Sequence, residues 1–316
     1  MAGDSAKNNF DMDKYLEKFQ RILTGKISRR QFLKGVTGVF VLSGLSLGKG
    51  YYNTFHSQIR LEQVQIKIPN LPSSFKGLRI AQISDLHSSS IVSQESIVRA
   101  VELAMEQKPD LIVLTGDYIG EKAQMHIDEI HEFHREYLDK CVDALSYLKA
   151  PMGIFAVLGN HDYWAGPEAT QAIHDDLKSK LGVTWLRNSN VLLKYKGQEI
   201  ALMGVEDYWE KSCSLGDALK GTDKKTKVLL SHNPDINEII FPFQNIDLVL
   251  SGHTHGGQIA FPFIGTPFYP GLHGQKYRRG LVRDGARQTY INRGVGHLVI
   301  PVRFNSPPEV TLITLI

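Results

Sequence analysis

The sequence predicts an α/β domain in which two packed sheets carry helices on their outer faces. Over residues 78–158, apolar runs of strand length alternate with helical patterns. The second half is richer in extended segments than in helices. Such an alternation is typical of a sheet with helices packed against it, and the added strands favour a second sheet. No internal repeat or Gly/Ser linker divides residues 61–316, so we expect one domain there.

The first half predicts a β-α-β-α-β series. Each apolar run ends abruptly in small and polar residues, and Pro109 and Pro151 mark the returns from helix to strand. The expected strands are Leu78–Ser84, Asp110–Thr115 and Gly153–Leu158, and the expected helices are Gln94–Gln107 and Met125–Lys149.

The second half predicts seven further strands after a helix at Glu168–Leu181, and a short helix after Pro234. Their residues are apolar or β-branched and are bounded by polar segments. The expected strands are Val183–Leu186, Val191–Tyr195, Glu199–Val205, Lys227–Ser231, Asp247–Ser251, Thr289–Asn292 and Glu309–Leu315.

Composition and charge exclude several classes of protein. With 42% hydrophobic and 22% charged residues in 316, the chain is neither largely disordered nor a polytopic membrane protein. Residues 1–34 hold eight basic and four acidic residues, which leaves 28 basic against 29 acidic in the remainder. The body therefore gives no sign of nucleic-acid binding. Cys141 and Cys213 are too few for a disulfide scaffold, and we expect two free thiols rather than one disulfide.

The first 48 residues have the layout of an export signal. Arg29-Arg30 stands in the frame Ser-Arg-Arg-Gln-Phe-Leu-Lys, and an uncharged apolar stretch of 14 residues, Gly35–Gly48, follows. A bilayer-spanning helix needs about 20 residues, so the stretch is typical of a signal, and the paired arginines resemble a twin-arginine signal. An amphipathic surface helix is the alternative, which the lack of a polar face disfavours. No Ala-x-Ala follows, so both cleavage and persistence as a membrane anchor stay open; residues 49–60 are the expected tether.

Five short polar motifs each follow one of the expected strands directly. Loops at the carboxyl ends of strands converge on the ligand site of an open α/β sheet, so we expect the motifs to meet. Any one of them is a common loop sequence, but all five in order are rare. The motifs are Asp85-Leu86-His87, Gly116-Asp117, Gly159-Asn160-His161-Asp162, Ser231-His232 and Gly252-His253-Thr254-His255.

The side chains of these motifs are those that two neighbouring divalent ions need. Neutral imidazole and carboxylate suit Zn, Fe and Mn, and the lack of Cys argues against a structural zinc site. On extended backbone alternate residues point the same way, so Asp85 should converge with His87, and His253 with His255. The motif glycines permit tight turns and close approach of the backbone.

The five motifs together resemble those of the calcineurin-like metallophosphoesterases, over the chain from about Leu78 to its C-terminus. The resemblance implies a four-layer α/β/β/α sandwich with two divalent metal ions per chain. It implies that His161 lies near the scissile phosphate without binding metal, and that Asp162 orients its ring. It assigns one ion to Asp85, His87, Asp117 and His255, and the other to Asp117, Asn160, His232 and His253.

Three segments also resemble an exported bacterial branch of that family, which includes YkuE/YaeI-like phosphodiesterases and is related to pyrophosphatases of UDP-diacylglucosamine. They are Gly252–Ile259, Asn292–Gly296 and Pro301–Glu309. The resemblance implies hydrolysis of a phosphodiester or diphosphate, lipid-linked substrates included. The alternatives are a phosphomonoesterase and an exported metal-binding scaffold without turnover.

The leader and the branch together imply where the protein works. We expect the twin-arginine translocation machinery to export it to the outer face of the cytoplasmic membrane, the periplasm or the cell wall, with a membrane surface as partner.

Other polar residues have weaker signals. His126, His131 and His134 are interleaved with charged residues and are expected on a solvated helix face, and His56, His174, His273 and His297 are expected to have no role in the site. A phosphate contact is the less favoured reading of Lys276, Arg278 and Arg279. The aromatic loop 261–270 is expected to cover the core edge, with an acyl-chain or membrane contact as the alternative.

Overall fold

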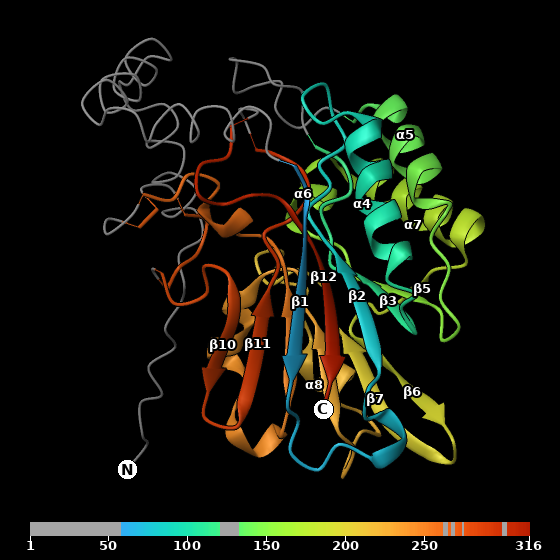
Figure 1. Ribbon diagram of the computed structural model, residues 1–316, viewed down its shortest axis with the longest axis vertical. Helices are drawn as coiled ribbons and strands as arrows, with labels where there is room; N and C mark the ends of the chain where they lie inside the picture. The colour runs from blue at the N-terminus through green and yellow to red at the C-terminus, as the bar shows by residue number, and fades with distance from the viewer. Residues whose placement is uncertain (1–57, 121–132, 262–264, 267–268, 274, 299–301) are drawn as a thin grey trace, which may run out of the picture. The chain divides into compact units, whose positions relative to one another are not determined.

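Two six-stranded mixed sheets form the framework of the part of the chain that the structure describes (Figure 1). The structure is a computed structural model and describes residues 58–120, 133–261, 265–266, 269–273, 275–298 and 302–316. The predicted signal segment and residues 49–57 of the tether lie outside these residues, as do His56, His126 and His131. No helix among the described residues is both long enough and apolar enough to cross a membrane.

The first sheet has its parallel strands in the order in which the chain makes them. β2 pairs with β3, β3 with β4 and β4 with β5, all parallel, while β12 pairs antiparallel to β2 and parallel to β1. Its strands are β1 (Arg60–Ile66), β12 (Glu309–Leu315), β2 (Arg79–Ile83), β3 (Leu111–Leu114), β4 (Ile154–Ala156) and β5 (Thr184–Trp185).

The second sheet has a parallel centre and two antiparallel edges. β11, β9, β8 and β7 run parallel, and β10 and β6 pair antiparallel at the two ends. Its strands in spatial order are β10 (Gly280–Asp284), β11 (Arg287–Ile291), β9 (Leu248–Ser251), β8 (Lys227–Leu230), β7 (Gln198–Gly204) and β6 (Ser189–Tyr195).

Three apolar layers hold helices and sheets together, which confirms the predicted four-layer sandwich. One layer joins the first sheet to α4 (Gln94–Glu106), α5 (Arg135–Leu145) and α7 (Pro167–Leu181). The middle layer lies between the sheets, where Ile80 and Val113 meet Leu202 and Leu250. The third packs the second sheet against α8 (Leu215–Ala218) and the 3₁₀ helix η3 (Pro234–Ile239). Smaller elements are the helix α6 (Asn160–Trp164) and the 3₁₀ turns η1 (Ser73–Phe75), η4 (Pro242–Gln244) and η5 (His255–Gly257).

The structure corrects three predictions about elements. The described helix before Pro151 ends at Leu145, not Lys149, because residues 146–152 form turns that return the chain to β4. His134 precedes this helix as its N-cap. The strands β1 and β10 were missed. Both are edge strands whose residues are mostly half-buried or exposed, so neither is an apolar run.

Candidate metal centre

The seven predicted ligands all come from the ends of five strands. Asp85 and His87 follow β2, Asp117 follows β3, and Asn160 begins α6 after β4; His232 follows β8, and His253 and His255 follow β9. All seven side chains are buried. Strand ends of both sheets therefore contribute to one interior cluster.

The backbone of these loops is left-handed rather than extended. Asp85, His87, Asp117, His253 and His255 all have positive φ, between 46° and 70°. Such a conformation is uncommon for residues other than glycine and, where it occurs, clusters at functional sites. The two paired motifs thus converge, but not by the alternation of an extended segment that the sequence suggested.

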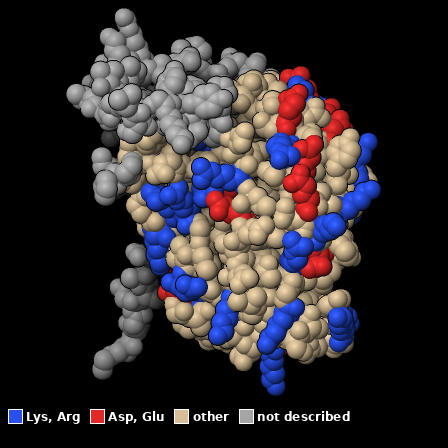
Figure 2. Space-filling view, viewed as in Figure 1, with Lys and Arg blue, Asp and Glu red and all other residues tan. Residues whose placement is uncertain are grey.

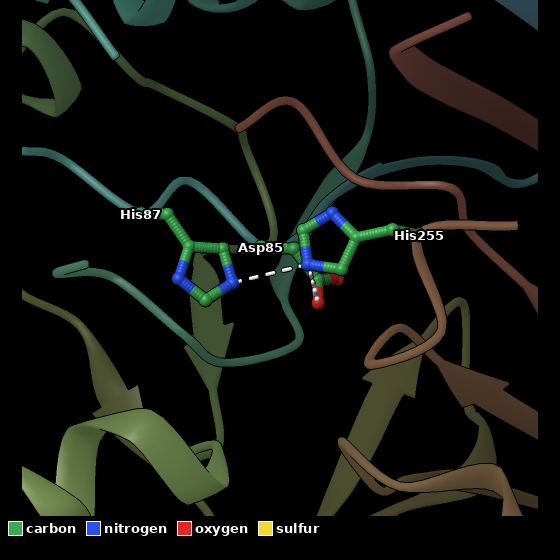
Figure 3. Close-up of side chains that lie close together, drawn as sticks. All are labelled: Asp85, His87 and His255. Carbon is green, nitrogen blue, oxygen red and sulfur yellow. Dashed lines mark hydrogen bonds and ion pairs between the residues drawn. The ribbon is translucent and has the colours of Figure 1, made fainter. Parts of the chain in front are cut away.

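The first group of donor atoms is formed by Asp85, His87 and His255 (Figure 3). Nε2 of His255 lies 3.1 Å from Nε2 of His87 and 3.4 Å from Oδ1 of Asp85. Figure 3 shows the two imidazoles with a dashed line between their facing nitrogens, and the Asp85 carboxylate next to the His255 ring. Two ring nitrogens and a carboxylate oxygen therefore point into one small volume.

The second group is formed by Asn160, His232 and His253, and Asp117 joins the two groups. Nδ1 of His253 lies 2.8 Å from Oδ1 of Asn160 and 3.2 Å from Nε2 of His232. Oδ2 of Asp117 lies 3.1 Å from Nε2 of His232 and 3.3 Å from Nε2 of His87. One carboxylate oxygen thus stands between the groups, where a bridging ligand would lie.

Glycines allow the strand ends to come this close. A Cβ on Gly159 would lie 2.1 Å from Oδ1 of Asp117, and one on Gly252 would lie 2.2 Å from Oδ2 of Asp85. Any side chain at either position would displace a candidate ligand. This confirms the predicted close approach of backbone at the motif glycines.

The outer nitrogens of the rings have different partners. Nδ1 of His232 lies 2.7 Å from the carbonyl oxygen of Thr115, and Nε2 of His253 lies 3.0 Å from that of Pro270. A ring N–H donated to either carbonyl leaves the other nitrogen free to bind a metal. Nδ1 of His255 lies 3.0 Å from Nη2 of Arg303, whereas Nδ1 of His87 has no hydrogen-bond partner among the described residues.

The buried charges perturb one another strongly. Burial raises the pKa of Asp85, while for Asp117 the effect of burial is outweighed by His232 and His161, which hold its pKa well below the ordinary value. Burial would lower the pKa of His232, but Asp117 raises it well above its ordinary value. Burial and the charge of His232 lower the pKa of His253 to about 3. Carboxylates and imidazoles this close to one another cannot all take their ordinary charge without a positive charge between them. A bound cation supplies that charge in place of shared protons.

The donor set fits two divalent metal ions. It consists of carboxylate oxygens, one amide oxygen and imidazole nitrogens, without a thiolate, which suits Mn, Fe or Zn. The ring nitrogens that face each other within each group, at 3.1 and 3.2 Å, would gain a common partner if a cation bound between them in place of a proton. The assignment of each residue to one ion or the other stays a prediction.

His161 lies beside the centre, where its ring forms a possible donor group with His87 and Asp117; that it binds no metal stays a prediction. Its ring is 4.8 Å from the ring of His87 and 4.9 Å from that of Trp164, centroid to centroid, and it is half-buried. Its backbone N–H donates to Oδ1 of Asp117 at 3.0 Å. A side chain in this place can contact a phosphate held by the centre.

Asp162 has a different set of contacts from the one expected. Its carboxylate accepts the backbone N–H groups of Asp117, Tyr118 and Gly159 at 2.8–2.9 Å. It therefore ties the loop after β3 to the start of α6. An influence on the His161 ring stays a prediction.

The three basic residues with weaker signals have different contacts. Lys276 pairs with Glu238 at 2.6 Å and Arg279 donates to the carbonyl of Asn305 at 2.6 Å, whereas the carbonyl of Arg278 accepts from Thr254, between the two His ligands. Residues 262–264 and 267–268 of the aromatic loop lie outside the described residues.

Most of the histidines set aside are peripheral to the centre. His174, which lies in α7, stacks on Trp185 of β5. His273 is exposed, and His134 packs against Tyr137. Cys141 is buried and Cys213 half-buried, and both are free as predicted.

Four residues near the centre escaped the motif search. Arg303 contacts His255, and Trp209 packs edge-on against the ring of His253 with centroids 4.4 Å apart. Asp207 is fully buried after β7. Burial, Arg303 and His87 together lower the pKa of His297 to about 3, which places that ring near the centre too. Arg303 lies in the segment 301–309 that resembles the exported branch, and His297 was set aside, but neither residue had a signal for a role at the centre; a lone Asp or Trp after an ordinary loop carries no motif at all.

Comparison with known proteins identifies the chain's relatives. Residues 78–257 match the calcineurin-like phosphoesterase family. The chain is 34% identical to an uncharacterized metallophosphoesterase, YkuE, of Bacillus subtilis, over 92% of this chain and 98% of that protein. It is 33% identical to the phosphodiesterase YaeI of Escherichia coli, over 92% of this chain and 100% of that protein.

A further relative matches over less of the chain. An uncharacterized metallophosphoesterase of Aquifex aeolicus is 30% identical over 81% of this chain and 92% of that protein. The matched range contains all seven candidate ligands and His161. The chain therefore belongs to the calcineurin-like phosphoesterase family.

Proposed function

We propose that the protein is a dinuclear-metal-dependent phosphodiesterase that acts outside the cytoplasmic membrane on a phosphodiester or diphosphate, lipid-linked substrates included. The observation that carries the proposal is the position of Asp117 Oδ2, within 3.3 Å of a ring nitrogen from each donor group. The likeness to a phosphodiesterase of E. coli supports diesters over monoesters.

Two ions held by the seven candidate ligands would supply Lewis-acid chemistry for phosphate oxygens and would lower the pKa of bound water from 15.7 toward about 7. The chain's own residues orient the substrate and move protons. Asn160 supplies an amide oxygen beside His253, and His161 adjoins the opposite group through His87. A protonated His161 can donate to the leaving oxygen as the phosphorus–oxygen bond breaks.

The path of the chain supports action at a membrane surface. Arg60 begins β1 at the end of the sheet that carries the candidate ligands, because its N–H donates to Pro308 beside Glu309. Glu309 in turn donates its N–H to Gly294, which packs against Asp85. The described chain therefore enters the domain at the end that carries the candidate ligands.

Surface charge supports a substrate other than nucleic acid. On the face shown in Figure 2, Lys and Arg side chains lie among Asp, Glu and uncharged surface rather than in one basic field. This agrees with the even balance of charges after residue 34.

The catalytic part of the proposal is tested on the full chain loaded with Mn²⁺, Fe²⁺ or Zn²⁺. We expect bis-p-nitrophenyl phosphate and lipid-linked diphosphates to be hydrolysed faster than p-nitrophenyl phosphate. A clear preference for the monoester would make the protein a phosphomonoesterase. No turnover of any of them with both metals bound would favour a scaffold.

The location is tested by replacing Arg29 and Arg30 together with Lys. We expect the double variant to stay in the cytosol as full-length protein, whereas the wild type and the matched variant Arg21→Lys reach the membrane fraction. Export of the double variant would contradict the twin-arginine route. A wild-type N-terminus beyond Gly48 would replace the anchor by a cleaved signal.

A further inference from the structure

Arg303 is a buried arginine that contacts a candidate metal ligand but belongs to none of the five motifs. Its side chain is 2% exposed, and it lies in the segment 301–309, to which neither the metal centre nor the proposed chemistry assigns a role. Nη2 lies 3.0 Å from Nδ1 of His255, and Nη1 lies 3.4 Å from the carbonyl oxygen of the same residue. The guanidinium therefore reaches both the ring and the backbone of His255.

Arg303 also donates hydrogen bonds to carbonyls of two other segments, the loop 293–296 and its own loop at Ser306. Nη1 donates to the carbonyls of Arg293 at 2.8 Å and Ser306 at 3.2 Å. Nη2 donates to Gly294 at 3.3 Å, and Nε donates to Gly296 at 3.2 Å. One side chain thus holds the loop 293–296, its own loop and the turn that contains His255.

The loop 293–296 is itself pressed against a second candidate ligand. The N–H of Gly296 donates to the carbonyl of Asp85 at 2.7 Å, and that of Val295 donates to Ser84 at 3.1 Å. A Cβ on Gly294 would lie 2.5 Å from Cβ of Asp85, so the approach leaves no room for another side chain. Arg303 is therefore linked to His255 directly and to Asp85 through one loop.

Only an arginine fits this arrangement. A guanidinium offers five N–H donors in a rigid planar fork, whereas a lysine offers three donors from one point. No carboxylate pairs with Arg303 within 4.0 Å among the described residues, so carbonyl oxygens stabilise its charge. The approach to Nδ1 of His255 is a packing contact, because a metal-bound imidazole carries its proton on the outer nitrogen and a guanidinium cannot accept it. A guanidinium stays charged at neutral pH, so all of its N–H groups remain donors.

We propose that Arg303 is a positioning residue for one of the two metal sites, the one that includes Asp85, His87 and His255. It fixes the backbone of His255 through its carbonyl, and the loop behind Asp85, without touching metal or substrate. The second site, with His232 and His253, has carbonyl partners of its own and is independent of Arg303. The inference rests on the proposed two-metal centre but not on the choice of substrate.

The experiment is a metal titration of the variant Arg303→Lys. We expect one of the two Mn²⁺ sites to lose about 10- to 100-fold in affinity, the usual effect of losing an outer partner of a metal ligand, while the other site is unchanged. After dialysis against low Mn²⁺, elemental analysis should find one ion per chain, and saturating Mn²⁺ should restore most of the activity. His255→Ala should weaken the same site, and the double variant should be no weaker there than His255→Ala.

A matched control separates positioning from general stability. Arg287 also donates to two carbonyls, those of Ile240 and Asn237, at 2.9 and 3.0 Å, but lies next to Asp284 and away from the candidate ligands. We expect Arg287→Lys to keep both Mn²⁺ affinities even if its melting temperature falls. Equal loss of affinity in Arg287→Lys and Arg303→Lys, or two unchanged sites in Arg303→Lys, would overturn the proposal.

A milder variant decides the case if Arg303→Lys does not fold. The hydroxyl of Ser306 donates to the carbonyl of His255 at 2.8 Å, so Ser306→Ala removes one link of the same cluster. Selective weakening of one site supports the proposal, and unchanged affinities contradict it. A wild-type chain that binds no metal would instead overturn the two-metal function itself.

Discussion

The two halves of the metal centre are supported from behind by different kinds of group. His232 and His253 meet backbone carbonyls, those of Thr115 and Pro270. His255 meets a charged guanidinium from the C-terminal segment, and the outer nitrogen of His87 has no partner among the described residues. The family match ends at residue 257 and so contains every candidate ligand but not Arg303. The ligand motifs therefore omit the group behind His255, which comes from the C-terminal segment, but their loops lie close to the groups behind His232 and His253.

Removal of Asp117, the ligand that the two halves share, should affect both halves equally. We expect Asp117→Ala to lose both ions, because Oδ2 of Asp117 lies between the groups. Activity should fall by more than about 10³-fold, the upper range for loss of a single electrostatic stabiliser. Elemental analysis measures the metal content, and His87→Ala, which should weaken mainly one site, is the comparison. Retention of one ion in Asp117→Ala would show that the carboxylate does not bridge.

The resemblance assigns His161 to neither half, although its ring lies close enough to His87 and Asp117 to share an ion with them, so we expect its removal to leave both halves intact. We expect His161→Ala to keep two ions and to lose about 10²–10⁴-fold in kcat, the range for a positioned proton donor. His174→Ala, on the outer helix α7, is the control and should retain wild-type activity. Loss of metal from His161→Ala, or a wild-type rate, would show that the role is misassigned.

Gly252→Ala should affect the half that contains Asp85. The new Cβ would lie 2.0 Å from Oγ of Ser84 and 2.2 Å from Oδ2 of Asp85, so we expect a selective loss of metal affinity and about 1–3 kcal/mol of stability. Gly216→Ala, where a Cβ meets nothing within 4 Å, is the control and should change stability by less than about 1 kcal/mol. Metal titration and urea unfolding measure the two effects. An unchanged metal affinity would mean that Asp85 moves freely.

The smallest expected effect is on the pH dependence of stability, and it comes from Asp207, on the side of the centre near His232. Its Oδ1 accepts the N–H of Trp209 at 2.8 Å, Oδ2 has no hydrogen-bond partner among the described residues, and burial raises its pKa to about 7. The folded protein keeps the proton of Asp207 up to about pH 7, whereas the unfolded chain releases it near pH 4. The free energy of unfolding of the metal-free protein should therefore fall as pH rises from about 4 to 7, by at most about 1.4 kcal/mol per pH unit.

Asp207→Asn should make that dependence less steep. Urea unfolding of metal-free wild type and variant at pH 5 and pH 8 gives the comparison, which cancels the contribution of the other buried acids. The same slope in both proteins would place the titration elsewhere.

The sequence predicted the central strands and all seven candidate ligands because both leave local signals. Buried strands such as Leu111–Leu114 are continuous apolar runs, and each ligand follows one directly. The edge strands β1 and β10 lack that signal because solvent covers one side of them. The left-handed backbone at five ligands was also unpredictable, since Asp and His have no pattern that marks positive φ. Arg303 was missed because its role depends on contacts between three distant segments.

The glycines at the strand ends also limit which sequences can evolve. Gly116, Gly159, Gly252, Gly294 and Gly296 each have a neighbouring atom where a Cβ would stand, within 2.6 Å in every case. Every missense change at a glycine codon adds at least that atom. In a saturation library selected for activity, these codons should be as depleted of variants as those of the candidate ligands, although the glycines bind nothing. A designer who transplants the centre into another protein would have to carry over this bare backbone together with the side chains.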